Sequence, residues 1–163
     1  MSIIDVDRGR QIVKTAADVM TTDVLTVTPE TLVARVAAMI LDYQITALPV
    51  VDDEQRLLGI VSEDDVVRLA EAKRDSGRAW WLTLMNTSAA DLREVFGKGE
   101  QPVSQVMSRD VVIASENTSL RKLTTMLSRR RIKQVPILRD GKLVGLVSRI
   151  DILRYLAEER TIL

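Results

Sequence analysis

Two seven-residue stretches decide the fold of this chain: Gly59-Ile-Val-Ser-Glu-Asp-Asp65 and Gly145-Leu-Val-Ser-Arg-Ile-Asp151. Both consist of glycine, two apolar residues, serine, two variable residues and aspartate. In each stretch an apolar run leads into Ser-x-x-Asp, which is typical of a strand followed by the first turn of a helix. Their similarity indicates an internal duplication, which is the first feature to test in a new sequence.

Two further blocks recur in the same order. The block Asp18-Val-Met-Thr-Thr-Asp-Val-Leu25 returns as Gln105-Val-Met-Ser-Arg-Asp-Val-Val112, and Leu48-Pro-Val-Val51 returns as Val135-Pro-Ile-Leu138. The matching methionines and the matching prolines are each 87 residues apart, and the glycines of the first pair are 86 apart. Three blocks in order and in register establish a tandem repeat.

Each copy is predicted to contain a short strand, a helix, two strands and a second helix. Thr28 and Ser115 are expected to cap the first helices, and Asp140-Gly141 is typical of a tight hairpin turn. The other predicted features are listed together: short strands over 24–27 and 111–113; helical stripes of Leu32, Val36, Met39 and Ile40 and of Leu120, Leu123 and Leu127; strands over 48–51, 57–61, 135–138 and 143–147; and second helices that start at Ser62 and Ser148.

The resulting architecture is α/β (α+β), with repeats over residues 15–75 and 102–160. Residues 76–101 have no counterpart and are expected to form a helical insertion, which holds both tryptophans, Trp80 and Trp81. A copy of roughly 55–60 residues is marginal on its own, so the two are expected to pack together. At least one of the tryptophans is interpreted as a core residue; the alternative is that the pair forms a lid or a dimer contact.

Composition excludes several functional classes. Lys+Arg and Asp+Glu both number 23, and the chain has no cysteine and no histidine. Thiol nucleophiles, histidine acid–base chemistry and ordinary zinc sites are therefore absent, and no catalytic group assembles, so an enzyme is not expected. The neutral balance disfavours nucleic-acid binding despite the basic run Arg129-Arg-Arg-Ile-Lys133. No export signal or membrane segment is visible, which favours a cytoplasmic protein.

The Ser-x-x-Asp pattern has two interpretations. A helix N-terminus that follows a strand attracts phosphate, and an aspartate one turn on accepts hydrogen bonds from two adjacent sugar hydroxyls. Alternatively, the serine and aspartate form a capping box that only satisfies the helix end. The pattern recurs behind the same glycine in both copies, and this recurrence favours the ligand-binding interpretation.

The three blocks together resemble the CBS domain, named after cystathionine β-synthase, present as a tandem pair or Bateman module. The resemblance implies two pseudo-symmetric β-α-β-β-α repeats packed through their sheets. It also implies clefts for an adenine nucleotide (AMP, ADP or ATP), with NAD or S-adenosylmethionine as less favoured ligands. Asp65 and Asp151 would hold the ribose, and Ser62 and Ser148 would lie near phosphate. Adenine would lie near Asp23-Val24 and Asp110-Val111.

The two clefts are expected to be unequal. At the positions that carry basic residues in nucleotide-sensing relatives, this sequence has Thr46 and Ala47 in the first copy, and Lys133 and Gln134 in the second. Arg149 adds a positive charge to the second copy where Glu63 stands in the first. Because cations attract phosphate and carboxylates repel it, the second copy should bind a nucleotide more tightly.

The sequence therefore predicts a regulatory adenine-nucleotide sensor without catalysis. The alternative is a structural dimerisation module with empty or degenerate clefts. Apolar helix faces predict a homodimer, and an effector domain or partner protein is expected to receive the signal.

Overall fold

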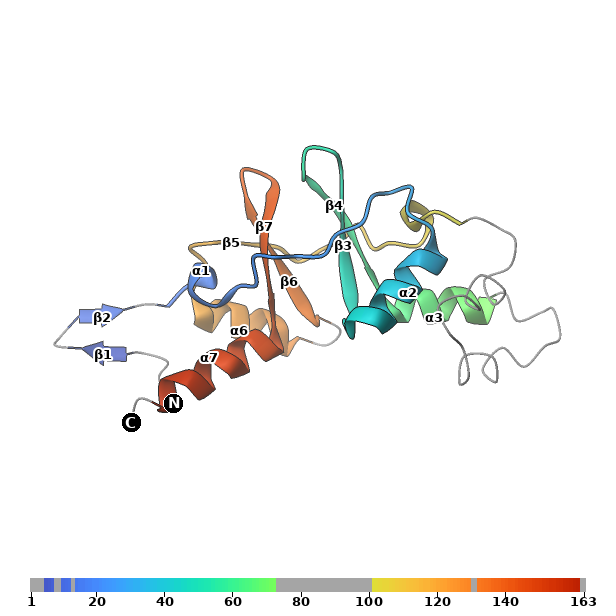
Figure 1. Ribbon diagram of the computed structural model, residues 1–163. Helices are drawn as coiled ribbons and strands as arrows, with labels where there is room; N and C mark the ends of the chain where they lie inside the picture. Colours follow the sequence, from blue (N-terminus) through green and yellow to red (C-terminus); the bar gives the residue numbers. More distant parts are fainter. Residues whose placement is uncertain (1–4, 8–9, 13, 73–100, 130–131, 162–163) are drawn as a thin grey trace. The chain divides into compact units, whose positions relative to one another are not determined.

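The computed structural model describes residues 5–7, 10–12, 14–72, 101–129 and 132–161 (Figure 1). The chain divides into two compact units. Unit 1 comprises Met1–Val24 and Val112–Leu163, and unit 2 comprises Leu25–Val111. We call the Val-Met block, residues 18–25 in the first copy and 105–112 in the second, the opening block of that copy. Except for its last residue, each opening block belongs to the same unit as the strands and second helix of the other copy. The predicted insertion, with Trp80 and Trp81, lies outside the described residues except for its last residue, Gln101.

Unit 1 is built on a three-stranded sheet with the order β5-β6-β7, in which β5 is parallel to β6 and β7 is antiparallel to it. Figure 1 shows α6 and α7 side by side along this sheet, and both contact its strands. A separate hairpin of β1 and β2 precedes α1. The elements are β1 (Asp5–Asp7), β2 (Arg10–Ile12), α1 (Ala16–Val19), β5 (Ala114–Ser115), α6 (Leu120–Ser128), β6 (Gln134–Arg139), β7 (Lys142–Ser148) and α7 (Arg149–Thr161).

Unit 2 is built on the antiparallel hairpin of β3 and β4, with α2 and α3 packed beside it. The opening block of the second copy and the short 3₁₀ helix that leads into it complete this unit. The elements are α2 (Val33–Tyr43), β3 (Ala47–Val51), β4 (Leu57–Ser62), α3 (Glu63–Ala72) and the 3₁₀ helix η2 (Val103–Gln105).

Each unit has its own hydrophobic core, drawn from both copies of the repeat. In unit 1, Ala16 of the first copy packs with the fully buried Leu123 and Ile137 of the second. In unit 2, Val103 and Met107 of the second copy join the core around Leu48 of the first. Burial of a valine or methionine side chain contributes about 1.5–3 kcal/mol, so Val103 and Met107 of the second copy contribute substantially to the stability of unit 2.

The strand and second-helix predictions are confirmed. All four predicted hairpin strands are present, extended by a residue or two at their ends, and α3 and α7 begin directly after Ser62 and Ser148. Asp140 and Gly141 have φ values of 52° and 77°, as a type I′ hairpin turn requires. The α6 stripe of Leu120, Leu123 and Leu127 is buried as predicted.

The predicted caps at Thr28 and Ser115 are wrong. Both residues lie in local turns: the Thr31 hydroxyl accepts a hydrogen bond from the Thr28 N–H at 3.1 Å, and Thr118 and Ser115 repeat this contact at 3.1 Å. The helices begin later, at Val33 and Leu120. Hydroxyl side chains that bond to nearby backbone offer an alternative to the helix, and here the turn is preferred.

The short leading strands also differ from prediction. In the first copy the expected strand 24–27 is reduced to a single parallel bridge between Val27 and Val50. In the second, the strand is β5, which follows the predicted range 111–113. Leu32 of the predicted α2 stripe precedes the helix and is 38% exposed, so it is not a core residue.

Candidate functional site

The site in unit 1 begins with the way Thr21 is held in place. Its N–H donates to the carbonyl of Leu146, and its own carbonyl accepts from the Leu146 N–H, both at 2.9 Å. The preceding helix α1 is anchored to the second copy as well, because the Ala16 N–H donates to the Thr118 carbonyl at 2.8 Å. Thr21 of the first copy is thereby fixed beside β7 of the second.

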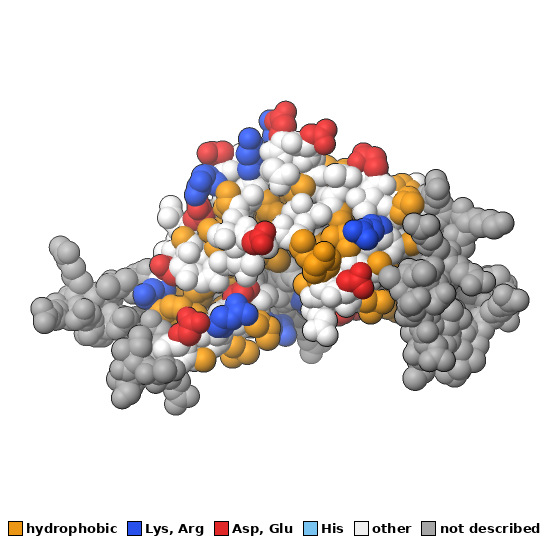
Figure 2. Space-filling view, in the orientation of Figure 1, with side chains coloured by type: hydrophobic (Ala, Val, Ile, Leu, Met, Phe, Trp, Pro, Cys, Tyr) orange, Lys and Arg blue, Asp and Glu red, His pale blue; other side chains and the backbone are white. Residues whose placement is uncertain are grey.

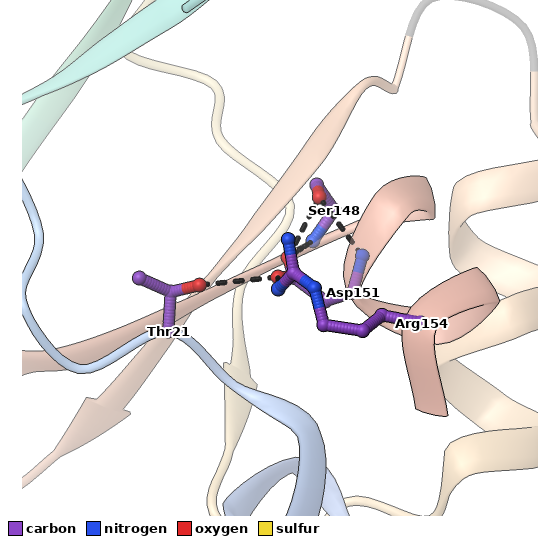
Figure 3. A network of polar contacts seen from close by, with 4 residues as sticks. All are labelled: Thr21, Ser148, Asp151 and Arg154. Carbon is purple, nitrogen blue, oxygen red and sulfur yellow. Dashed lines mark hydrogen bonds and ion pairs between the residues drawn. The ribbon is translucent and has the colours of Figure 1, made fainter. Parts of the chain in front are cut away.

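The Thr21 side chain contacts the carboxylate of Asp151 (Figure 3). Its hydroxyl donates to Asp151 Oδ1 at 3.1 Å, and Arg154 Nη1 lies 3.4 Å from the same oxygen. Asp151 Oδ2 accepts from the backbone N–H and the hydroxyl of Ser148, at 2.7 and 2.6 Å. Asp151 is only 8% exposed, whereas the Arg154 side chain is 61% exposed. A buried carboxylate thus lies in the first turn of α7 with donors on both oxygens.

Unit 2 contains a similar arrangement. Asp65 Oδ2 accepts from the N–H and hydroxyl of Ser62, both at 2.8 Å, and Asp65 Oδ1 pairs with Arg68 at 2.9 Å. Ser108 occupies the position of Thr21, and its backbone makes the same double pairing, here with Ile60. Within the described ranges, however, no hydrogen bond joins the Ser108 side chain to Asp65.

These contacts bear directly on the two interpretations of Ser-x-x-Asp. The capping box is present in both units, because each aspartate accepts from its serine N–H and each serine hydroxyl lies 3.4 Å from the aspartate N–H. Capping uses only Oδ2, so Oδ1 of Asp65 and of Asp151 still has capacity for other partners. The hydroxyl protons of Ser62 and Ser148 are given to these carboxylates and are not directed at a phosphate.

The other predicted site residues separate between the units. The predicted site residues that share a unit with Asp151 come from both copies of the repeat, and so do those that share a unit with Asp65. Unit 1 holds Asp23, Val24, Lys133, Gln134, Ser148 and Arg149, whereas unit 2 holds Thr46, Ala47, Ser62, Asp110 and Val111. Asp23 and Asp110 are exposed, and Lys133, Gln134 and Thr46 are half-buried. Each opening block lies with the aspartate of the opposite copy.

Arg149 has a structural partner that the sequence did not indicate. Its Nε and Nη2 donate to the Leu127 carbonyl at 3.1 and 2.8 Å. Leu127 lies in the last turn of α6, where carbonyls lack helical partners and a cation is favourable. Glu63, which stands in the place of Arg149 in unit 2, donates its backbone N–H to the Thr46 carbonyl at 2.9 Å.

Sequence reasoning missed Thr21, Arg68 and Arg154 as neighbours of the aspartates. A signal for the arginines was present, since Asp65-x-x-Arg68 recurs as Asp151-x-x-Arg154, and residues three apart on a helix are neighbours. The Thr21 contact had no such local signal, because Thr21 and Asp151 are 130 residues apart.

Charged side chains of both signs lie on the described surface. Figure 2 shows acidic and basic side chains interspersed on the described part of this face, without a continuous basic patch. In the described ranges no group of three or more metal-ligating side chains gathers. None of the helices described there is long and apolar enough to cross a bilayer.

Both copies of the repeat match the model of one known protein family. The CBS domain matches residues 16–72 and again residues 103–158, which together are more than half of the chain. The chain belongs to the CBS-domain family. It is a CBS pair, or Bateman module, and its mixed α/β fold of small sheets and helices is that of solved CBS pairs.

Its curated relatives include both a small CBS protein and an enzyme. The CBS domain-containing protein YhcV of Bacillus subtilis is 28% identical over 83% of this chain and 80% of its own length. Inosine-5'-monophosphate dehydrogenase of Methanocaldococcus jannaschii is also 28% identical, over 94% of this chain. The match spans only 26% of that enzyme, so CBS pairs occur both as small proteins and as parts of enzymes.

Two solved structures are similar in fold. The structure of CBSX2 from Arabidopsis thaliana in complex with AMP has a TM-score of 0.70 and 23% identity, covering 90% of this chain and 98% of CBSX2. The CBS pair of protein MJ0100, in complex with 5'-methylthioadenosine and S-adenosyl-L-methionine, has a TM-score of 0.66 and 19% identity. It covers 91% of this chain and 99% of that chain. Both of these structural neighbours bind adenosine derivatives.

Proposed function

We propose that this CBS pair is a regulatory module that binds an adenine nucleotide and performs no catalysis itself. The ribose hydroxyls bind the carboxylates of Asp151 and Asp65, and the adenine lies near the opening block of the same unit. That block contributes Asp23 and Val24 beside Asp151, and Asp110 and Val111 beside Asp65. The signal passes to an effector domain or a partner protein.

The observation that carries the proposal is the arrangement of the Asp151 carboxylate. A capping role alone would need one oxygen, and Ser148 uses Oδ2 for that purpose. Oδ1 is directed to Thr21 and to Arg154, whose long contact at 3.4 Å is made by a mostly exposed side chain. An ionised carboxylate with an exchangeable partner is a suitable acceptor for a sugar hydroxyl, and hydrogen bonds to charged groups are among the stronger ones.

Charge supports a preference for nucleotides over nucleosides in unit 1. Lys133 is half-buried directly before β6, whereas its counterpart in unit 2 is the neutral Thr46. A partly buried cation attracts phosphate more strongly than an exposed one because the effective dielectric constant is lower. Lys133→Ala should therefore weaken ATP binding more than adenosine binding.

The direct test is a panel of ligands on the full chain, read by thermal shift. AMP, ADP, ATP, NAD and S-adenosylmethionine are each added at millimolar concentration, with cytidine monophosphate as the control without adenine. A ligand at 100 times its Kd stabilises by about 2.7 kcal/mol, which is roughly 5–10 °C for a protein of this size.

Two outcomes would count against the proposal. No shift with any adenine compound would favour the alternative, a structural dimerisation module whose ligand sites are empty. An equal shift with cytidine monophosphate would mean that the site recognises ribose and phosphate without reading the base.

A further inference from the structure

We infer that Thr21 is a positioning residue, which orients the Asp151 carboxylate for the ribose hydroxyls and makes the site of unit 1 better preorganised than that of unit 2. The inference rests on the proposed function, since it concerns the same ligand. It adds Thr21 to the site of Asp151. Thr21 belongs to the opening block of the first copy, whereas Asp151 belongs to the Ser-x-x-Asp motif of the second.

The backbone of Thr21 is anchored on β7. Both backbone hydrogen bonds to Leu146 are 2.9 Å long, and the neighbouring Met20 packs so closely on Gly145 that a Cβ atom there would lie 2.5 Å from the Met20 sulfur. These anchors involve neither the hydroxyl nor the methyl group of Thr21. The position of Thr21 beside Asp151 is therefore set by its backbone, and replacing the hydroxyl alone leaves this support in place.

The number of hydrogen bonds that the Asp151 carboxylate can accept indicates the role of Thr21. An ionised carboxylate accepts about four hydrogen bonds, two on each oxygen. On Asp151, Ser148 supplies both donors to Oδ2, while Thr21 and Arg154 supply one each to Oδ1. Because Thr21 is anchored through its backbone, whereas Arg154 makes a longer contact of 3.4 Å from the end of a long side chain, a ribose hydroxyl displaces Arg154. The carboxylate plane then stays fixed by Ser148 and Thr21.

Unit 2 provides an internal control. Ser108 has the same backbone pairing as Thr21, but in the described part of the chain its side chain makes no hydrogen bond to Asp65. Asp65 Oδ1 is bonded instead by Arg68, whose side chain is 72% exposed. The Asp65 carboxylate is therefore fixed on its serine side only. An unequal pair of sites follows, for a reason independent of phosphate charge.

The test measures ligand affinity by calorimetry for four full-length proteins: wild type, Thr21→Val, Thr21→Ser and Ser108→Ala. Valine keeps the shape of threonine and removes the hydroxyl, while serine restores the hydroxyl. We expect Thr21→Val to lose about five- to tenfold in AMP affinity, which corresponds to the net contribution of one ordinary hydrogen bond. Thr21→Ser and Ser108→Ala should bind within about twofold of wild type.

A second ligand separates positioning from general stability. The 2',3'-dideoxy analogue of AMP lacks both ribose hydroxyls, including the one that would replace Arg154 on the carboxylate, so Thr21→Val should bind it as well as wild type does. An equal loss for AMP and the dideoxy analogue would overturn the inference, as would unchanged or tighter AMP binding by Thr21→Val. The last result would mean that the hydroxyl competes with ribose.

The same data distinguish failure of the inference from failure of the proposed function. Wild-type protein that binds no adenine nucleotide contradicts the proposed function and removes the basis of the inference. Wild-type protein that binds AMP, together with an unaffected Thr21→Val variant, contradicts the role of Thr21 alone.

Discussion

The side chain of Met20 lies against Gly145 so closely that a Cβ atom on residue 145 would be 2.5 Å from the Met20 sulfur. Unit 2 repeats the relationship, with a Cβ on Gly59 placed 2.8 Å from the Met107 sulfur. The Val-Met block and the glycine of Gly-x-x-Ser are thus two sides of one contact, and each contact joins the two copies of the repeat. The glycine is needed for packing, and it leads directly into the serine and aspartate of the site.

This contact predicts that adding a methyl group at either glycine destabilises the protein. We expect Gly145→Ala to cost about 1–3 kcal/mol in the free energy of unfolding, the usual range for overpacking. Gly59→Ala should cost more, because its Cβ would also lie 2.7 Å from the backbone carbonyl oxygen of Ser108, which cannot move as a methionine side chain can.

Urea unfolding of the two variants measures this order. A double-mutant cycle with Met20→Ala provides the control, since Gly145→Ala should be less costly when the methionine is absent. If Gly145→Ala lowers the free energy of unfolding equally with Met20 and with alanine at residue 20, the added methyl group does not clash with the Met20 side chain.

Arg149 is predicted to stabilise α6 through its hydrogen bonds to the Leu127 carbonyl. Arg149→Met keeps much of the length of the side chain and should lower the free energy of unfolding by about 1–2 kcal/mol, because a helix C-terminal carbonyl loses a charged donor. Arg154→Met is the control, since that arginine is 61% exposed and makes only a long contact. Equal losses in the two variants would contradict the capping role.

The ion pair of Glu116 and Arg139 predicts a specific dependence on pH. Hydrogen bonds from the Arg139 guanidinium hold the pKa of the Glu116 carboxyl below its ordinary value of 4.5. Since the folded-state pKa is lowered, the pair stabilises the protein above about pH 4.5, and this contribution is lost as the pH falls through the folded-state pKa. Glu116→Gln lacks the charge, so its deficit relative to wild type should shrink on acidification. A deficit that is the same at pH 7 and at pH 3 would contradict this linkage.

A homodimer remains a prediction from the apolar helix faces. In unit 1, Ile150 and Leu153 lie one turn apart on α7 and are 60% and 59% exposed, and exposed apolar side chains of this size favour association. Light scattering over a range of concentrations should give twice the monomer mass. The monomer mass at every concentration up to high micromolar would contradict the prediction.

Local sequence patterns predicted most of the elements of this fold but not the way the copies combine. The Asp140-Gly141 turn and the Leu120 stripe depend on neighbours in the sequence, so they could be identified without a structure. The pairing of Thr21 with Leu146 joins residues 125 apart, and no local pattern encodes it. The cap of the first copy was misassigned for a related reason, since Val33 N–H is satisfied by the carbonyl of Gln101 rather than by a nearby side chain. In the second copy the cap is local but lies four residues later, at Ser119, whose hydroxyl accepts from the Lys122 N–H.

The candidate site was predicted to a similar extent. Ser148 and Asp151 were identified from their spacing, and the structure brings them together in a capping box. Arg149 was also identified from the sequence, as a charge that distinguishes the two copies. Its hydrogen bonds to the Leu127 carbonyl, and the contact of Thr21 with Asp151, became apparent only when tertiary contacts were known. Their hydrogen-bond partners lie on elements distant in sequence, so spacing alone could assign them no contact.

The most direct test of the account is AMP binding by the Asp151→Asn and Asp65→Asn variants, measured by calorimetry against wild type. Asparagine keeps the shape of the side chain and an acceptor oxygen, and removes the charge that favours the ribose hydroxyls. The account predicts a loss of about tenfold or more for Asp151→Asn, a smaller loss for Asp65→Asn, and no measurable binding by the double variant, with all three folded by thermal melting. Wild-type affinity for AMP in the double variant would contradict it.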